Sequence, residues 1–189
     1  MKKTIIISLF SITVLAQWLV PLQMIWQEEN IITKGTVYKF RTQPIDPTDP
    51  YRGKYITLDY EIRSFQTKDS IWYGNDKVFV YLKTDSLGFA QVDRISKEEL
   101  GGNNLDFVEA EVDWYSDYDK SLHFHLPFDR FYMEEHKAKP AERIVMERNP
   151  EKRMETYAKV AVNEGEASLI DVMVNGISIA DYVEQMDDE

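Results

Sequence analysis

The chain has 189 residues and a formal net charge of −11, because 33 acidic side chains outnumber 22 basic ones. A domain this acidic repels nucleic acid and anionic lipid headgroups, so we expect no nucleic-acid partner. The sequence contains no Cys, which excludes disulfides, thiolate metal sites and cysteine nucleophiles.

The N-terminal segment is typical of a membrane span. Residues 4–26 contain no charged side chain and are bounded by Lys2 and Lys3 on one side and by Glu28 and Glu29 on the other. At ~1.5 Å per residue, this stretch is long enough to cross the ~30 Å hydrocarbon core of a bilayer. We therefore predict a single N-terminal transmembrane helix that contacts lipid through residues 4–26.

The two lysines also predict the topology, because positively charged residues stay on the cytoplasmic side. Residues 1–29 then form an uncleaved signal-anchor, and residues 30–189 form one extracytoplasmic domain. A cleaved signal peptide is the alternative, since Val14-Leu15-Ala16 is an acceptable cleavage site. The apolar run continues past that site to Trp26, which favours the anchor. Both alternatives export the domain.

Alternation of apolar and polar residues is the main signal after the anchor. In residues 55–62, the side chains of Ile56, Leu58, Tyr60 and Ile62 share one face, which predicts a half-buried strand. Further strands are predicted at Thr36–Thr42, Lys77–Thr84, Phe89–Ile95, Leu105–Trp114, Ser121–Leu126, Thr156–Val162 and Ala167–Val174.

Turn residues and one helical pattern complete the predicted fold. Asn163-Glu164-Gly165 lies between two alternating runs and predicts a hairpin. Residues 139–153 break the alternation: Pro140 suits the first turn of a helix of ~10 residues, and Pro150 ends it. The sequence thus predicts a mainly β domain, either a β-sandwich or a partly open barrel, with one inserted surface helix behind the transmembrane helix.

The segment Pro44–Gly53 holds three prolines, which fix the backbone. Asp46 and Asp49 can accept hydrogen bonds from nearby backbone N–H groups. One interpretation is a rigid loop that delivers the chain into the strand at 55–62. The other is a preorganised binding surface built around Asp46, Asp49 and Arg52, because loops on rigid scaffolds often carry function.

Residues 128–135 form a second segment that is both charged and aromatic. One interpretation is an irregular connection between a strand and a helix, whose aromatic side chains cover the end of the sheet. Alternatively, Asp129 and Glu134 pair with Arg52 across the fold, as carboxylates do with a guanidinium group. The candidate binding residues are then Asp46, Asp49, Arg52, Gly53, Tyr55, Asp129, Arg130 and Glu134.

Two histidines, His123 and His125, fall on one face of a predicted strand. A His-x-His pair can chelate zinc, but the sequence identifies no third ligand. Histidines on the exposed face, opposite buried Leu122 and Phe124, are the simpler explanation. We therefore predict no metal site and no cofactor, with His123 and His125 as weak candidates for metal binding.

The run Gly53-Lys-Tyr55-Ile-Thr-Leu58-Asp-Tyr60 resembles the motif that names the GDYXXLXY protein family, a set of bacterial membrane-anchored proteins. The lead-in from Asp46 to Arg52, the segment Leu126–Glu135 and the hairpin Tyr157–Gly176 are similar to that family as well. The resemblance covers the N-terminal helix and essentially all of the domain. Lys54 stands where the family has Asp, which reverses the charge at that position.

The resemblance implies a bacterial origin and a multi-pass inner-membrane partner, and it implies no particular reaction. The residues provide no complete catalytic set, so we expect a non-enzymatic binding or assembly domain in the periplasm, anchored in the cytoplasmic (inner) membrane. The alternative is a hydrolase that uses carboxylates near Arg52 and Asp129. A signal-peptidase-like enzyme has less support, because Ser64 and Lys68 form no recognisable Ser–Lys dyad.

Overall fold

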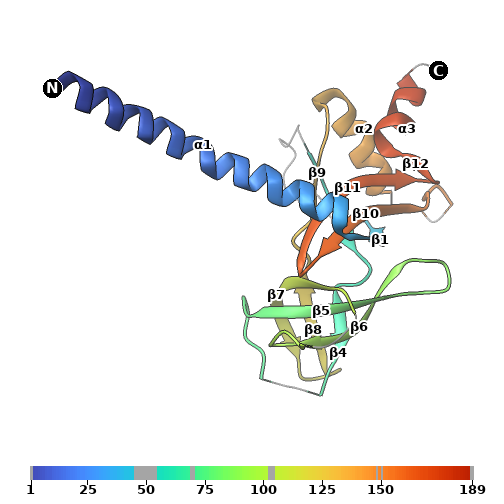
Figure 1. The fold of residues 1–189 in the computed structure, drawn as a ribbon. Coiled ribbons are helices and arrows are strands. Elements are labelled where there is room, and N and C mark those ends of the chain that lie inside the picture. Colours follow the sequence, from blue (N-terminus) through green and yellow to red (C-terminus); the bar gives the residue numbers. More distant parts are fainter. Residues whose placement is uncertain are drawn as a thin grey trace.

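The computed structural model describes residues 2–44, 55–68, 71–101, 105–147, 149 and 151–187, and it shows a mainly β domain carried by one long helix (Figure 1). The predicted fold class is therefore confirmed. Within the described ranges the helices are α1 Lys2–Lys34, α2 Glu135–Val145 and α3 Ile179–Asp187. The strands there are β1 Thr36–Gln43, β2 Tyr55–Thr57, β3 Asp59–Tyr60, β4 Ser64–Gln66, β5 Lys77–Thr84, β6 Ala90–Ser96, β7 Phe107–Ser116, β8 Ser121–His125, β9 Arg130–Tyr132, β10 Thr156–Asn163, β11 Glu166–Val174 and β12 Ile177–Ser178.

The N-terminal helix α1 is long and apolar enough to cross a membrane. None of its most apolar window is buried against the rest of the protein, and large side chains such as Leu9, Leu15 and Trp26 are exposed. Pro21 lies inside α1 without ending it, and the helix continues past the C-terminal end of the apolar run to Lys34. The exposed apolar surface of α1 is what a helix in contact with lipid requires.

One residue, Gly35, separates α1 from β1. Its N–H donates to the carbonyl oxygen of Ile31 at 2.9 Å. A side chain at position 35 would press against the backbone carbonyl oxygens of Ile31 and Val162, so only glycine fits this joint. Ile31 is itself buried against the domain. The long helix α1 therefore leads into the sheet through one glycine whose neighbours are packed.

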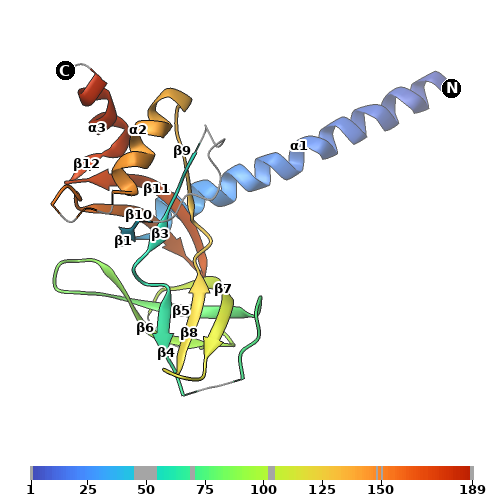
Figure 2. The same cartoon turned by 180° about the vertical axis from the view of Figure 1, so that it is seen from behind.

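Five antiparallel strands form a sheet in the order β12-β11-β10-β1-β3. We call it the proximal sheet because α1 packs on it. Glu164 and Gly165 connect β10 to β11, and both have positive φ, as in a two-residue type I′ hairpin. This confirms the hairpin predicted at Asn163–Gly165. The last turns of α1 pack on β10 and β11, while α2 and α3 pack on each other beside the same sheet (Figure 2).

The distal sheet has the strand order β4-β8-β7-β5-β6 and is also antiparallel. It meets the proximal sheet at the tip of the β10–β11 hairpin, where the Glu109 N–H donates to the Gly165 carbonyl at 2.9 Å. A second bridge joins Lys39 to Phe89. One core spans both sheets, and its central ring, Phe40, is 0% exposed. A second, smaller cluster is formed by Phe89, Tyr157 and Met173. Because the larger core draws on both sheets, the two sheets pack as one unit within the described ranges.

The predicted strand at 55–62 is wrong in one respect, because the chain changes sheets in its middle. β2 pairs with β9, whereas β3 pairs with β1 of the proximal sheet. At the break, the Leu58 N–H donates to the Asp129 carbonyl at 2.8 Å. The alternation itself was predicted correctly, since Ile56, Leu58 and Tyr60 are all buried.

The predicted start of the surface helix is also wrong. α2 begins at Glu135, and Pro140 lies inside it instead of in its first turn. The reason is burial: Ala138 packs in the core one turn before Ala141, so the helical face extends upstream of the proline. α2 ends at Val145, where the Met146 N–H donates to the Glu142 carbonyl at 2.9 Å.

Candidate functional site

The motif-like run that begins at Tyr55 and the segment 128–135 meet in a two-stranded ribbon. β2 and β9 pair so that Tyr55 lies opposite Tyr132 and Thr57 lies opposite Arg130. The candidate residues Asp46, Asp49, Arg52 and Gly53 lie outside the described residues. Of the candidate set, the structure thus brings together Tyr55, Asp129 and Arg130.

An aromatic and cationic surface covers this ribbon. The rings of Tyr55 and Tyr132 are 5.3 Å apart, and the Arg130 guanidinium lies 5.4 Å from the Tyr55 ring centroid. The Arg130 Nε also lies 3.9 Å from a carboxylate oxygen of Asp129. A hydrogen bond with Tyr132 and the charge of Asp129 raise the pKa of Arg130, which keeps the guanidinium charged. Such a surface can stack on a planar or anionic group.

Leu58 and Tyr60 tie the same two segments together inside the core. Besides the Leu58 bond to Asp129, the Tyr60 hydroxyl donates to the Phe128 carbonyl at 2.7 Å. The rings of Phe40, Tyr60 and Phe128 pack edge to face, with centroids 4.9–5.8 Å apart. Burial raises the pKa of Tyr60 well above its ordinary value, helped by the carboxylates of Asp129 and Asp59. The side chains of the motif-like run are therefore structural at Leu58 and Tyr60, and accessible at Tyr55.

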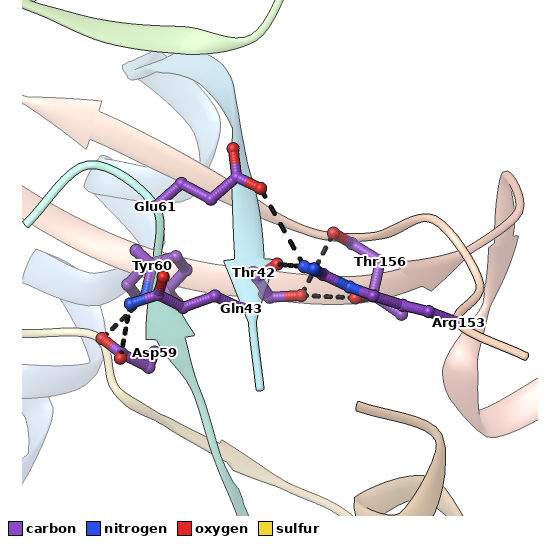
Figure 3. A network of polar contacts seen from close by, with 7 residues as sticks. All are labelled: Thr42, Gln43, Asp59, Tyr60, Glu61, Arg153 and Thr156. Carbon is purple, nitrogen blue, oxygen red and sulfur yellow. Dashed lines mark hydrogen bonds and ion pairs between the residues drawn. The ribbon is translucent and has the colours of Figure 1, made fainter. Parts of the chain in front are cut away.

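A polar network fastens the edge of the proximal sheet beside this motif (Figure 3). Asp59 accepts hydrogen bonds from the Gln43 amide at 2.7 Å and from the Arg63 guanidinium at 2.8 Å. On the other side, Thr42 shares a buried hydroxyl bond of 2.6 Å with Thr156. The Asp59 carboxylate is thus already neutralised within the protein, which indicates a structural role.

The other half of that network reaches the loop before β10. The Arg153 guanidinium donates to the Thr42 carbonyl at 3.0 Å and lies 3.9 Å from the Glu61 carboxylate (Figure 3). The arginine therefore closes the end of the sheet where β1 and β10 part.

A small crevice opens between the two sheets next to the motif. It has a volume of about 110 Å³, and its polar lining comes from Asp59, Arg63, Asp113, His125 and Asp129. This volume admits a few water molecules and no peptide or sugar. All three of its carboxylates have partners. Asp59 contacts Arg63, Asp113 lies 2.8 Å from the His125 ring, and Asp129 lies 3.9 Å from Arg130.

The remaining candidates lie apart from the crevice. Glu134 precedes α2, and its carboxylate faces His136 at 3.4 Å on the exposed surface. His123 stacks on Trp114 with the ring centroids 3.8 Å apart, and its Nε2 lies 3.0 Å from the Ser121 hydroxyl. In the part of the chain that the structure describes, no group of His, Asp and Glu side chains is arranged to hold a metal ion.

A larger groove, which the sequence did not predict, lies where α1 meets the two sheets. It has a volume of about 530 Å³ and is called the α1 groove below. Met24, Gln27, Glu28 and Ile31 of α1 form one wall at helical spacing. The opposite walls come from Lys77, Glu109, Ala110, Glu111, His125 and Pro127 of the distal sheet region and from Gly165, Glu166 and Ala167 of the β10–β11 hairpin.

Contacts across the α1 groove hold the helix on the domain. The Gln27 amide donates to the Glu166 carboxylate, and the Ser168 hydroxyl donates to the Glu28 carboxylate. Glu109 and Glu111 alternate with buried residues along β7 and so lie on the polar face of that strand. Nothing in that pattern indicated that α1 would lie beside this face, so the groove could not be found from periodicity.

Comparison with known proteins gives one family match. A family model described as "GDYXXLXY protein" matches residues 17–172, from within α1 to within β11. No curated protein and no solved structure matches the chain. The matched range contains the Tyr55–Tyr60 run, the ribbon and the α1 groove.

Proposed function

Because the chain belongs to the GDYXXLXY protein family, we propose that it is a single-pass protein of the bacterial cytoplasmic membrane with an uncleaved signal-anchor. Its N-terminus lies in the cytoplasm, and its β domain lies in the periplasm. There the domain acts as a non-enzymatic assembly module that binds a multi-pass inner-membrane protein.

The observation that carries this proposal is the unbroken passage of α1 into the domain. Past Trp26 the helix continues to Lys34, which adds about 12 Å at ~1.5 Å per residue before β1 begins. The Gly35 joint and buried Ile31 fix the helix on the proximal sheet. The domain is therefore held close to the bilayer in one orientation. Such an arrangement suits a module that completes an assembly in the membrane better than one that must reach soluble ligands.

The topology is tested by single cysteines, for which the chain is already suited because it contains none. Tyr118, at the tip of the β7–β8 hairpin, is fully exposed, and Thr4 lies at the start of the apolar run. We expect a membrane-impermeant maleimide to label Tyr118→Cys in intact spheroplasts and Thr4→Cys only after the membrane is opened. The reverse pattern would overturn the proposed topology. Retention of an N-terminal tag distinguishes the uncleaved anchor from a signal peptide cleaved after Ala16.

The partner is tested by a photo-crosslinking residue at Leu15, which is exposed in the middle of the apolar run. We expect ultraviolet light to join this position to a membrane protein with several spans, identified by mass spectrometry of the adduct. The same crosslinker at Tyr118, far from the helix, serves as the control and should give no such adduct. Adducts with lipid alone from Leu15 would contradict the proposal.

A further inference from the structure

The α1 groove carries an excess of negative charge. Four carboxylates line it, those of Glu28, Glu109, Glu111 and Glu166, against the single ammonium group of Lys77. Lys77 pairs directly with Glu109 at 2.9 Å and is also attracted by Glu111, so one cation faces four carboxylates.

The other three carboxylates of the α1 groove contact groups that carry no fixed charge. Glu28 accepts from the Ser168 hydroxyl and Glu166 from the Gln27 amide. Glu111 lies 3.5 Å from the ring of His125. Coulomb attraction therefore favours a cationic occupant, and it is strengthened where the groove walls exclude water.

Between these charges the α1 groove is apolar. Met24, Ile31, Ala110, Pro127 and Ala167 contribute to its lining. A volume of about 530 Å³ lies in the range of specific binding pockets and accommodates several side chains. The combination fits a segment that carries basic and apolar residues together, rather than a small inorganic cation.

The position of the α1 groove restricts where that occupant can come from. Met24 lies in the last turn of the uncharged run, beside exposed Trp26, an aromatic residue of the type that marks the membrane–water interface. The groove therefore opens at the outer surface of the membrane. Carboxylates at this level repel the phosphates of anionic lipids, which favours a protein segment over a lipid headgroup.

We propose that the α1 groove receives an extracytoplasmic segment of the partner membrane protein that carries Lys or Arg and lies next to one of its spans. This inference rests on the proposed function and names the chemistry of the contact. The basic side chains pair with Glu28, Glu111 and Glu166, and neighbouring apolar side chains fill the space beside Met24 and Ile31. The contact would position the partner's outer loop against the hairpin of the proximal sheet.

The test places a photo-crosslinking residue at Met24, which is uncharged and 65% exposed, in the full-length chain in native membranes. We expect the crosslinked peptide to be an extracytoplasmic segment with at least two basic residues within about ten residues of a span. Raising the salt concentration from 0.05 to 0.5 M should lower the adduct yield several-fold, because it screens the charge pairs.

A charge-neutralised variant supplies the second arm. Glu28→Gln, Glu111→Gln and Glu166→Gln together should lower the Met24 adduct at least fivefold. The matched control, Glu98→Gln, Glu99→Gln and Glu151→Gln, removes the same charge from exposed positions outside the groove and should leave the yield unchanged. The salt arm needs no substitution of a carboxylate, so the test survives if the neutralised variant folds poorly.

Several results would overturn the inference. These are an adduct with lipid only, with a second copy of this chain or with a segment that lacks basic residues, and a yield that neither salt nor neutralisation alters. If the chain with its native carboxylates gives no Met24 adduct while Leu15 still joins the multi-pass partner, the inference alone fails. If neither position gives an adduct in that chain, the proposed function fails.

Discussion

Replacing Gly165 with alanine is expected to lower the free energy of unfolding by about 2–4 kcal/mol. Gly165 has a φ of 88°, where a side chain adds roughly 1–2 kcal/mol of backbone strain. An alanine Cβ there would also lie 2.5 Å from the Phe107 ring. Because the Gly165 carbonyl accepts the Glu109 N–H, relief of this clash would pull the hairpin away from the distal sheet.

Gly176 offers a matched control for this substitution. It occupies the equivalent place in the β11–β12 turn with a φ of 86°, and a Cβ there meets nothing within 4 Å. Gly176→Ala should therefore show the backbone strain alone, about 1–2 kcal/mol. Urea unfolding in mild detergent, read by pulse proteolysis, measures both. Equal losses of unfolding free energy in the two variants would show that contact with Phe107 is not important. In the Gly165→Ala background, Phe107→Leu should restore part of the lost unfolding free energy.

Removing the Tyr60 hydroxyl is expected to destabilise the domain by about 1–3 kcal/mol at pH 8, since Tyr60→Phe leaves the buried Phe128 carbonyl without its donor. The aromatic packing with Phe40 is retained in this variant, so the loss reports the hydrogen bond. Tyr118→Phe, at a fully exposed position, is the control and should change stability by less than about 0.5 kcal/mol. If Tyr60→Phe leaves the free energy of unfolding unchanged, the bond to Phe128 has no structural role.

Alkaline unfolding gives a second measure of Tyr60. Its pKa in the folded protein is raised, so the unfolded state loses the phenolic proton first, near pH 10. Stability from Tyr60 is thus fully present below pH 10 and declines above it, by up to about 1.4 kcal/mol per pH unit. Burial and the hydrogen bond to Asp106 raise the pKa of Tyr38 to about 12. Tyr38 therefore also loses its proton at lower pH in the unfolded state than in the folded state, and it adds to the decline in stability. Tyr60→Phe should therefore reduce the slope between pH 10 and 12, by up to about 1.4 kcal/mol per pH unit.

Local patterns were sufficient for the strands that pair with near neighbours in the chain. β5 was predicted with its observed bounds, and the β10–β11 hairpin followed from alternation around Asn163–Gly165. Prediction failed where the partner is distant. The sequences of β2 and β3 look like one strand because their alternation is continuous. In the structure β2 pairs with β9 and β3 pairs with β1. The three residues of β9 carry too short a pattern to identify a strand before its partner is known.

The same distinction applies to the candidate site. Tyr55, Asp129 and Arg130 were selected for their chemistry, and the pairing of β2 with β9 brings them together. Glu134 was selected with them, yet it lies at the start of α2 beside His136. The α1 groove escaped prediction because it exists only once the helix lies against the β10–β11 hairpin and the polar face of β7. Neither element alone carries a sign of that contact.

With α1 in the membrane as proposed, the glycine joint would make the domain respond to the thickness of the bilayer. A helix that is too long for a thin membrane tilts until its apolar length fits. If a flexible linker joined the helix to the domain, the tilt of the helix would not change the orientation of the domain. Here a single residue transmits the tilt, because the Gly35 N–H donates to the Ile31 carbonyl and buried Ile31 holds the end of α1 on the domain. In the proposed assembly the domain would lean as the membrane thins, and the mouth of the α1 groove would change its angle to the bilayer.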